Sequence, residues 1–142
     1  MDWKNPDYDS VFAERAERLK RIREPGYDLP ALLAFYKGHC VEFVTDWGMT
    51  FDPRNAEIGK PSVVPFVLFQ RQAEFLEWLL ARWRKREDGL VEKSRDMGVS
   101  WVSLAIGRWL TKFRRGYAMG VMSRKKDLVD QNGSLDSLMQ KL

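Results

Sequence analysis

A segment around Gly98 constrains the fold of this chain more than any other, because it has the outline of a phosphate-binding loop. The standard pattern, G-x-x-x-x-G-K-[ST], uses glycine for backbone clearance, amides to surround phosphate oxygens, a lysine for the outer phosphates and a hydroxyl for Mg²⁺. Gly98 and Ser100 keep this register, but Lys93 stands at the first glycine and Val99 at the lysine. A bound nucleotide would therefore take its cation from Lys93 or Arg95.

The residues on either side of this loop predict the order strand, loop, helix. Leu90-Val91 form a short apolar run before the loop, which predicts the end of a strand. The apolar residues after it have helical spacing: Val102, Ile106, Trp109, Leu110 and Phe113. The N-terminus of such a helix favours an anion just before Gly98. The alternative is an ordinary strand-to-helix turn of an α/β domain.

A second candidate residue, Gln72, lies 21 residues before Lys93. It opens a predicted helix whose apolar face carries Phe75, Leu76, Leu79, Leu80 and Trp83. Its side-chain amide has a donor and an acceptor, so it can pair with the edge of an adenine ring. The alternative is a solvated glutamine in the first turn of a helix.

Three separated blocks occur in a specific order. They are Asp46-Trp47-Gly48-Met49-Thr50-Phe51-Asp52-Pro53-Arg54-Asn55, then Phe69-Gln70-Arg71-Gln72, then Glu92-Lys93-Ser94-Arg95-Asp96-Met97-Gly98-Val99-Ser100-Trp101. Over residues 43–130, these blocks resemble the large subunit of tailed-phage terminases, the ATP-driven motor that packages viral DNA. The family patterns are D-W-x-x-T-x-D-P-R, F-P-R-Q with Gln70 replacing the proline here, and a deviant Walker A loop with the lysine at its front.

The resemblance implies a role for each matching residue, with ATP and Mg²⁺ as cofactors. Gln72 would contact adenine, Lys93 would reach the outer phosphates, and Arg95 would be the catalytic sensor of the γ-phosphate. The amides of residues 96–100 would line the phosphate site, and the Ser100 hydroxyl would hold Mg²⁺. The implied nucleotide-binding set is Gln72, Lys93, Ser94, Arg95, Asp96, Met97, Gly98, Val99 and Ser100.

The predicted fold class is α/β in two parts. Residues 1–60 are expected to form a helical N-terminal region and connector, and residues 61–142 an incomplete P-loop NTPase domain with a parallel sheet. Its second strand, Tyr117–Met122, is followed by Ser123-Arg124-Lys125-Lys126 instead of the acids that ATP hydrolysis needs. We therefore interpret the chain as the N-terminal portion of a terminase large subunit, inactive alone. The partners implied by the full-length family are viral double-stranded DNA, the small terminase subunit and the portal protein, around a homo-oligomeric ring.

The first half of the chain predicts helices. A helix over residues 9–24 is expected to bury Phe12, Ala16, Leu19 and Ile22 and to carry the ion pairs Glu14–Arg18 and Glu17–Arg21. A second helix is capped by Asp28 and broken near Gly38, and the thiol of Cys40 is expected to be partly buried instead of binding a metal with His39. Residues 48–65 predict an irregular connector, and residues 123–130 the start of another helix.

Charge supports two further hypotheses. The net charge is +4, and basic residues crowd the first helix, residues 82–86 and residues 114–115, which is compatible with a basic helical DNA-binding protein. The other hypothesis is a non-enzymatic interaction module with a vestigial loop, which docks the small terminase subunit or the portal. No apolar run reaches membrane-spanning length, so no membrane association and a location in the cytoplasm of the bacterial host are expected.

Overall fold

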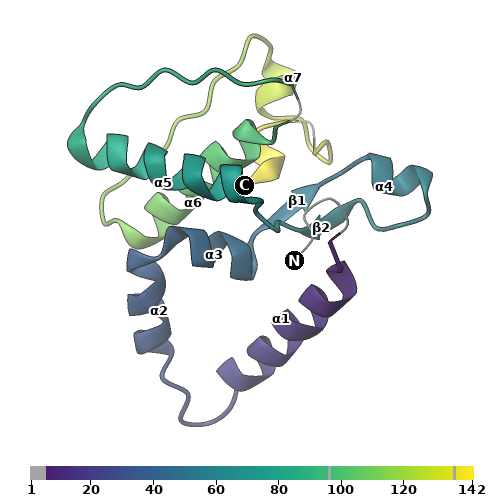
Figure 1. Cartoon of the computed structure of the whole chain (residues 1–142), viewed down its shortest axis with the longest axis vertical. Coiled ribbons are helices and arrows are strands. Elements are labelled where there is room, and N and C mark those ends of the chain that lie inside the picture. The colour runs from purple at the N-terminus through teal and green to yellow at the C-terminus, as the bar shows by residue number, and fades with distance from the viewer. Residues whose placement is uncertain (1–5, 96, 136) are drawn as a thin grey trace. The chain divides into compact units, whose positions relative to one another are not determined.

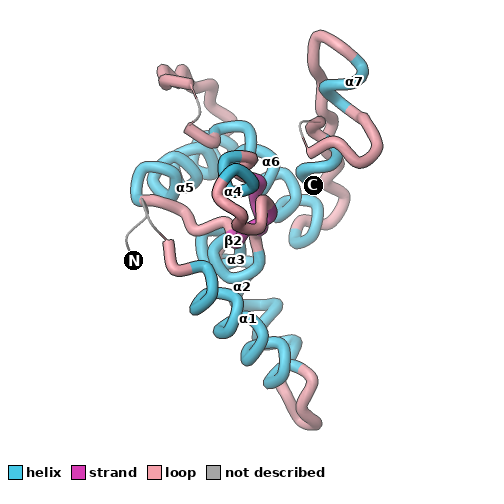
Figure 2. The backbone as a smooth tube through the Cα atoms, turned by 90° about the vertical axis from the view of Figure 1, so that its right-hand side faces the viewer, coloured by secondary structure: helices cyan, strands magenta, loops and turns pink. Residues whose placement is uncertain are grey.

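The computed structural model describes residues 6–95, 97–135 and 137–142, and most of these lie in helices (Figures 1 and 2). The elements of the first half are α1 (Tyr8–Ile22), α2 (Leu29–Gly38), α3 (Cys40–Trp47), β1 (Met49–Phe51), α4 (Arg54–Glu57) and β2 (Val63–Pro65). Those of the second half are α5 (Gln70–Lys85), α6 (Val99–Phe113), α7 (Lys126–Val129) and a short 3₁₀ turn, η1 (Met139–Lys141).

The predicted parallel sheet is wrong. Within the described residues the only sheet is a two-stranded antiparallel one, in which Met49 of β1 is paired with Pro65 of β2 and Phe51 with Val63. The run Leu90-Val91 is not a strand, and the side chain of Leu90 is 96% exposed. Two apolar residues flanked by charged ones cannot fill a buried strand, and a short run of this kind does not by itself identify one.

The second predicted strand is also wrong. Residues 117–122 have no regular secondary structure, and Ala118, Gly120 and Met122 are exposed. Strand hydrogen bonds need a neighbouring strand, and none lies beside this segment within the described residues. The helix predicted to follow it is the single turn α7.

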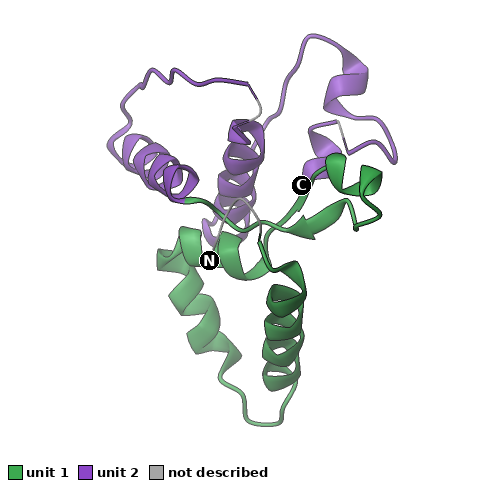
Figure 3. Ribbon diagram, turned by 45° about the vertical axis from the view of Figure 1, so that its right-hand side comes forward, with its two compact units in different colours: residues 1–69 green, residues 70–142 purple. Residues whose placement is uncertain are grey.

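The chain divides into two compact units, residues 1–69 and residues 70–142 (Figure 3). In the first unit, helix ends follow their local signals. The Asp7 carboxylate accepts a hydrogen bond of 3.1 Å from the amide of Ser10, and the Asp28 carboxylate one of 2.9 Å from that of Ala31. The predicted cap at Asp28 and the predicted break near Gly38 are confirmed.

The predicted buried face of α1 is wrong. Val11 and Arg15 are buried, whereas Phe12 and Leu19 are exposed. The reason is that Arg15 finds partners outside its own helix. Its guanidinium donates a hydrogen bond of 2.7 Å to the carbonyl of Thr45 and contacts the Met49 sulfur at 3.2 Å. A charged residue with such partners can be buried where the apolar stripe alone would not place it.

The second unit is organised by α5 and α6, which pack side by side (Figure 1). Of the apolar faces that the sequence predicts for these helices, the buried residues are Leu76, Leu80, Val102, Ile106, Trp109 and Leu110. Trp83, predicted to lie on the same face of α5, is instead 40% exposed, and Leu104 of α6 is buried although it was not predicted to be. Contacts at both ends show that the two helices run in the same direction. Gln72 meets Met97 at their N-terminal ends, and Trp83 meets Tyr117 at their C-terminal ends. A connector over residues 86–98 returns the chain to the start of α6.

Candidate nucleotide site at the start of helix α6

Gly98 makes the turn into α6. Its backbone φ of 70° and ψ of 13° lie in the left-handed region, which glycine enters without a Cβ penalty. Helix α6 begins at the next residue, and no side chain caps it. The N–H groups of its first turn therefore remain available to an anion, which the positive end of the helix dipole would also favour.

Gln72 lies directly against this turn. Its side chain is 8% exposed, and Nε2 donates a hydrogen bond of 3.2 Å to the carbonyl of Met97. A Cβ on residue 98 would lie 2.6 Å from Nε2, closer than packing allows. A side chain at residue 98 would therefore require the end of the Gln72 side chain to move. The amide contact joins two segments that are 25 residues apart.

The structure places the other predicted site residues as follows. Lys93, Ser94 and Arg95 lie in an exposed segment without regular secondary structure. None of their side chains makes a hydrogen bond or ion pair with another residue in the described part of the chain. Val99 and Ser100 form the first turn of α6, and the Ser100 side chain is exposed. Asp96 lies outside the described residues.

The site therefore brings together Gln72, Met97 and Gly98, and it leaves the side chains of Lys93 and Arg95 exposed. A parallel strand would fix such a loop at its carboxyl end, but here the hydrogen bond from Gln72 fixes it instead. Chemically, the arrangement offers uncapped amides, two exposed cations and an exposed hydroxyl. This is a set of groups for binding an anion. It contains no histidine or cysteine, and no cluster of metal-ligating side chains exists within the described residues.

The Asp46-Trp47 block has a structural role that sequence reasoning missed. The Asp46 carboxylate accepts a hydrogen bond of 2.6 Å from the Tyr36 hydroxyl and forms an ion pair with Arg18. Arg18 also donates to that hydroxyl, at 3.2 Å, and its guanidinium lies 5.8 Å from the centre of the Trp47 ring. This network joins α1, α2 and α3. The predicted Glu14–Arg18 pairing on one helix is wrong, because Arg18 is bound to Asp46 instead.

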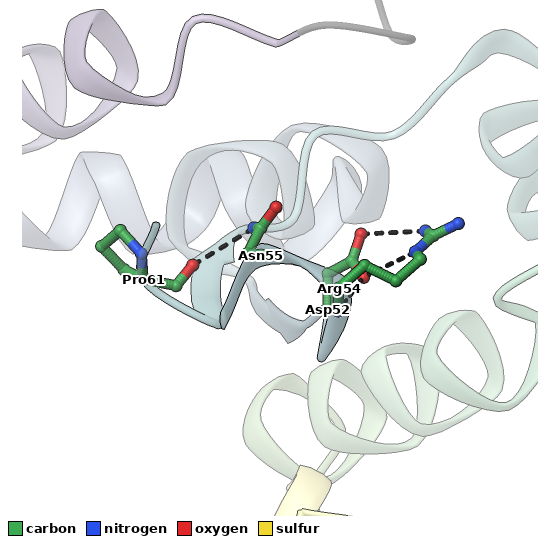
Figure 4. Close-up of polar contacts among 4 residues, drawn as sticks. All are labelled: Asp52, Arg54, Asn55 and Pro61. Atoms are coloured by element: carbon green, nitrogen blue, oxygen red, sulfur yellow. Dashed lines mark hydrogen bonds and ion pairs between the residues drawn. The ribbon is translucent and has the colours of Figure 1, made fainter. Parts of the chain in front are cut away.

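The Asp52-Pro53-Arg54 part of the same block shapes the loop between β1 and β2 (Figure 4). The Asp52 carboxylate accepts two hydrogen bonds from the Arg54 guanidinium, at 2.8 and 2.9 Å. Asn55 donates its side-chain amide to the carbonyl of Pro61, at 3.2 Å. The Arg54 hydrogen bonds lower the pKa of Asp52. The block that resembles a functional motif thus fixes the path of a hairpin, within a segment predicted to be irregular throughout.

Cys40 is buried, in agreement with the sequence prediction for its thiol. Within the described residues, no helix combines the length and apolar character that crossing a lipid bilayer requires.

Comparison of the chain with protein-family models, with curated proteins and with solved structures finds no match.

The network around Asp46 predicts a loss of stability in alkali. Burial raises the pKa of Tyr36 above its ordinary value of 10.0, and the hydrogen bond to Asp46 adds to the effect. The folded chain therefore favours the neutral phenol. The stability that Tyr36 contributes through this raised pKa is fully present below pH 10, and it is lost as the pH rises through the folded-state pKa. We expect Tyr36→Phe to cost about 1 kcal/mol at pH 7 and to remove this part of the alkaline decline.

Urea unfolding at pH 8 to 11 would measure this difference at each pH. Burial also raises the pKa of Tyr8. Its contribution to the alkaline loss of stability is the same in both proteins and therefore cancels in the comparison. Parallel stability curves for the two proteins across this range would contradict the prediction.

Proposed function

We propose that the turn before α6 binds ATP with Mg²⁺, and that the chain is the N-terminal ATP-binding portion of a terminase large subunit. In this proposal the chain is part of a motor that packages viral double-stranded DNA together with a small terminase subunit and a portal protein. The proposal keeps the family resemblance of the three sequence blocks. It does not retain the parallel sheet.

The observation that carries the proposal is the hydrogen bond from Gln72 to the carbonyl of Met97. The resemblance assigns Gln72 to the adenine side of the nucleotide and residues 93–100 to its phosphates. A shared site requires these two segments to lie together, and the buried amide contact supports that requirement. Gly98 has a left-handed backbone and no side chain, so a phosphate can approach the backbone closely at this turn.

Each residue would then contribute by its chemistry. The first-turn amides of α6 would donate to phosphate oxygens, and the exposed Ser100 hydroxyl would bind Mg²⁺. Lys93 and Arg95 would move onto the outer phosphates, since neither side chain is held by a partner within the described residues. Ordering two long side chains costs conformational entropy, so the expected affinity is weak, with a Kd of about 0.1–1 mM.

Titration calorimetry with a non-hydrolysable ATP analogue and Mg²⁺ would test the proposal. We expect Lys93→Ala to weaken binding about tenfold, equivalent to about 1.4 kcal/mol. Lys60→Ala is the matched control, because Lys60 is an exposed lysine in the other compact unit. Equal affinity of the Lys93→Ala variant and the unmodified chain would refute the assignment, as would the absence of any binding heat at about 10-fold excess over the expected Kd.

A second function is favoured by the exposed apolar side chains of the first unit. Phe12 and Leu19 of α1 and Leu29, Leu33 and Phe35 of α2 are all exposed, and exposed apolar surface marks sites of protein association. In this alternative the chain docks the small terminase subunit or the portal, and the loop before α6 is vestigial. The alternative predicts the same thermal stability with and without ATP, whereas the ATP site predicts stabilisation by bound ligand.

A further inference from the structure

The C-terminal ends of α5 and α6 form a surface that the ATP site does not use. The Trp83 and Tyr117 rings meet edge to face, with centroids 6.2 Å apart. The Arg114 guanidinium lies 5.9 Å from the centre of the Trp83 ring and 5.5 Å from that of Trp109. These contacts bring residues 82–88 and residues 112–117 together, although they are distant in the sequence. We call this region the cationic-aromatic surface.

The net positive charge of the protein comes from the two segments that form this surface. Residues 82–88 and 112–117 contain seven arginines and lysines and two carboxylates. The net charge of these two segments is more positive than the net charge of +4 of the whole chain. The remaining residues therefore have a slightly negative net charge. Arg84, Lys85, Arg86, Lys112 and Arg115 are exposed. A concentration of cations on one part of a nearly neutral chain is typical of a binding surface for a polyanion.

Capping of the helix dipoles accounts for only part of this charge. Basic side chains in the last turn of a helix interact favourably with its C-terminal carbonyls. Arg82 is already paired with Glu87 at 2.7 Å. The other cations of the surface form no ion pair with any carboxylate in the described part of the chain. They continue through consecutive positions 84, 85 and 86, past Lys85, the last residue of α5.

Arg86 occupies a position that glycine would fill with less strain. It follows the last residue of α5 with a φ of 56°, and its amide donates a hydrogen bond of 3.2 Å to the carbonyl of Trp83. The amide of Glu87 donates one of 3.0 Å to the carbonyl of Arg82. These two hydrogen bonds form a Schellman motif, a helix C-terminus at which glycine usually occupies the left-handed position. An arginine here suggests that its charge is useful for something other than ending the helix.

The aromatic side chains indicate which polyanion fits. Trp83 is 40% exposed amid the cations, so part of its indole ring is open to a ligand. Proteins that bind single-stranded nucleic acid combine cations along the backbone with aromatic rings on which unpaired bases stack. In a duplex the bases are already stacked and paired, so an exposed ring on a helix end gains little from them. The partly exposed ring therefore favours a single strand.

We propose that the cationic-aromatic surface binds single-stranded nucleic acid. A base stacks on the open face of Trp83, and Arg84, Lys85 and Arg115 neutralise the flanking phosphates. Arg114 lies against the Trp83 ring and orients it. The surface is at the opposite end of the α5–α6 pair from Gln72 and Gly98. Its function is therefore independent of the proposed ATP site.

Fluorescence anisotropy of a labelled 12-nucleotide oligo(dT) with the full chain would test this. We expect binding that weakens as salt rises, with a slope of log K against log [salt] of about −2 for three neutralised phosphates. Trp83→Ala should weaken binding about tenfold, and Trp83→Phe, which keeps a ring, should restore most of the affinity. The double variant Lys85→Ala/Arg115→Ala should make the slope shallower by about 1.4.

Substitutions outside the cationic-aromatic surface serve as matched controls. Arg21→Ala/Arg23→Ala removes two exposed cations from the other compact unit and should leave binding unchanged. Lys93→Ala should also leave it unchanged, even if that variant loses ATP. Three results would overturn the proposal: a duplex that binds as tightly as the single strand, anionic lipid vesicles that displace the oligonucleotide, or a Trp83→Ala variant that is folded and retains full affinity.

Discussion

Replacing Trp109 by alanine is expected to lower the free energy of unfolding of the second compact unit by about 3–5 kcal/mol. The Trp109 side chain is 0% exposed. Its ring also contacts Phe113, at 6.1 Å between centroids, and carries the Arg114 guanidinium on its surface. The substitution removes a large ring from a buried site, and partial relaxation of the surrounding residues leaves a cavity.

Hydrogen exchange of the α5 and α6 amides would measure this loss locally, without assuming that both units unfold together. Trp83→Ala is the matched control, because it removes the same side chain from a site that is 40% exposed. We expect it to cost about 1 kcal/mol, since little area is taken from water there. Similar losses for the two variants would show that the interior is not formed around Trp109.

Gly98→Ala is expected to cost about 2–5 kcal/mol and to abolish ATP binding. An alanine in the left-handed region costs about 1–2 kcal/mol by itself. In addition, its Cβ would lie 2.6 Å from Nε2 of Gln72. The glutamine is buried, so it must either give up its hydrogen bond to Met97 or push the turn away from α5. An unsatisfied buried amide adds about 1–3 kcal/mol.

Gly116→Ala isolates the backbone contribution. Gly116 has a φ of 75°, and an added Cβ there meets no atom within 4 Å. It should therefore show the strain alone. In a double-mutant cycle, Gln72→Ala should relieve part of the cost of Gly98→Ala, because the collision partner is removed. Urea unfolding of these variants and the unmodified chain measures the differences. Equal costs at the two glycines, or strict additivity with Gln72→Ala, would mean that Gln72 does not support the turn.

Much of the candidate site could be predicted from the sequence, because its signals are local. The glycine of the turn, the helix that follows and the apolar faces of α5 and α6 each depend on residues within a few positions of one another. Gln72 was selected for its amide chemistry, and the structure does place it at the turn. What it touches there is the carbonyl of Met97, a contact for which the sequence contains no signal. Its predicted contact with adenine stays a prediction.

The errors have a common physical cause. Leu90-Val91 resembled the end of a strand, but a strand needs a neighbouring strand for its hydrogen bonds. Within the described residues the only strands are β1 and β2, and they pair with each other. The buried face of α1 was predicted from its apolar stripe, but Arg15 and Arg18 found partners at Thr45 and Asp46, far along the chain. Periodicity reports which residues avoid water and contains no information on distant polar partners.

The sequence by itself determined the helix cap at Asp28, the helix break near Gly38 and most of the residues that α5 and α6 bury, because capping hydrogen bonds and helical spacing act over one or two turns. The tertiary structure decided that Gln72 supports the Gly98 turn, that Asp46 joins three helices, and that two basic helix ends meet beside Trp83. Each of these depends on bringing together residues that are 10 or more positions apart, as Tyr36 and Asp46 are. Such contacts form only when packing gains offset the entropy of closing the intervening chain.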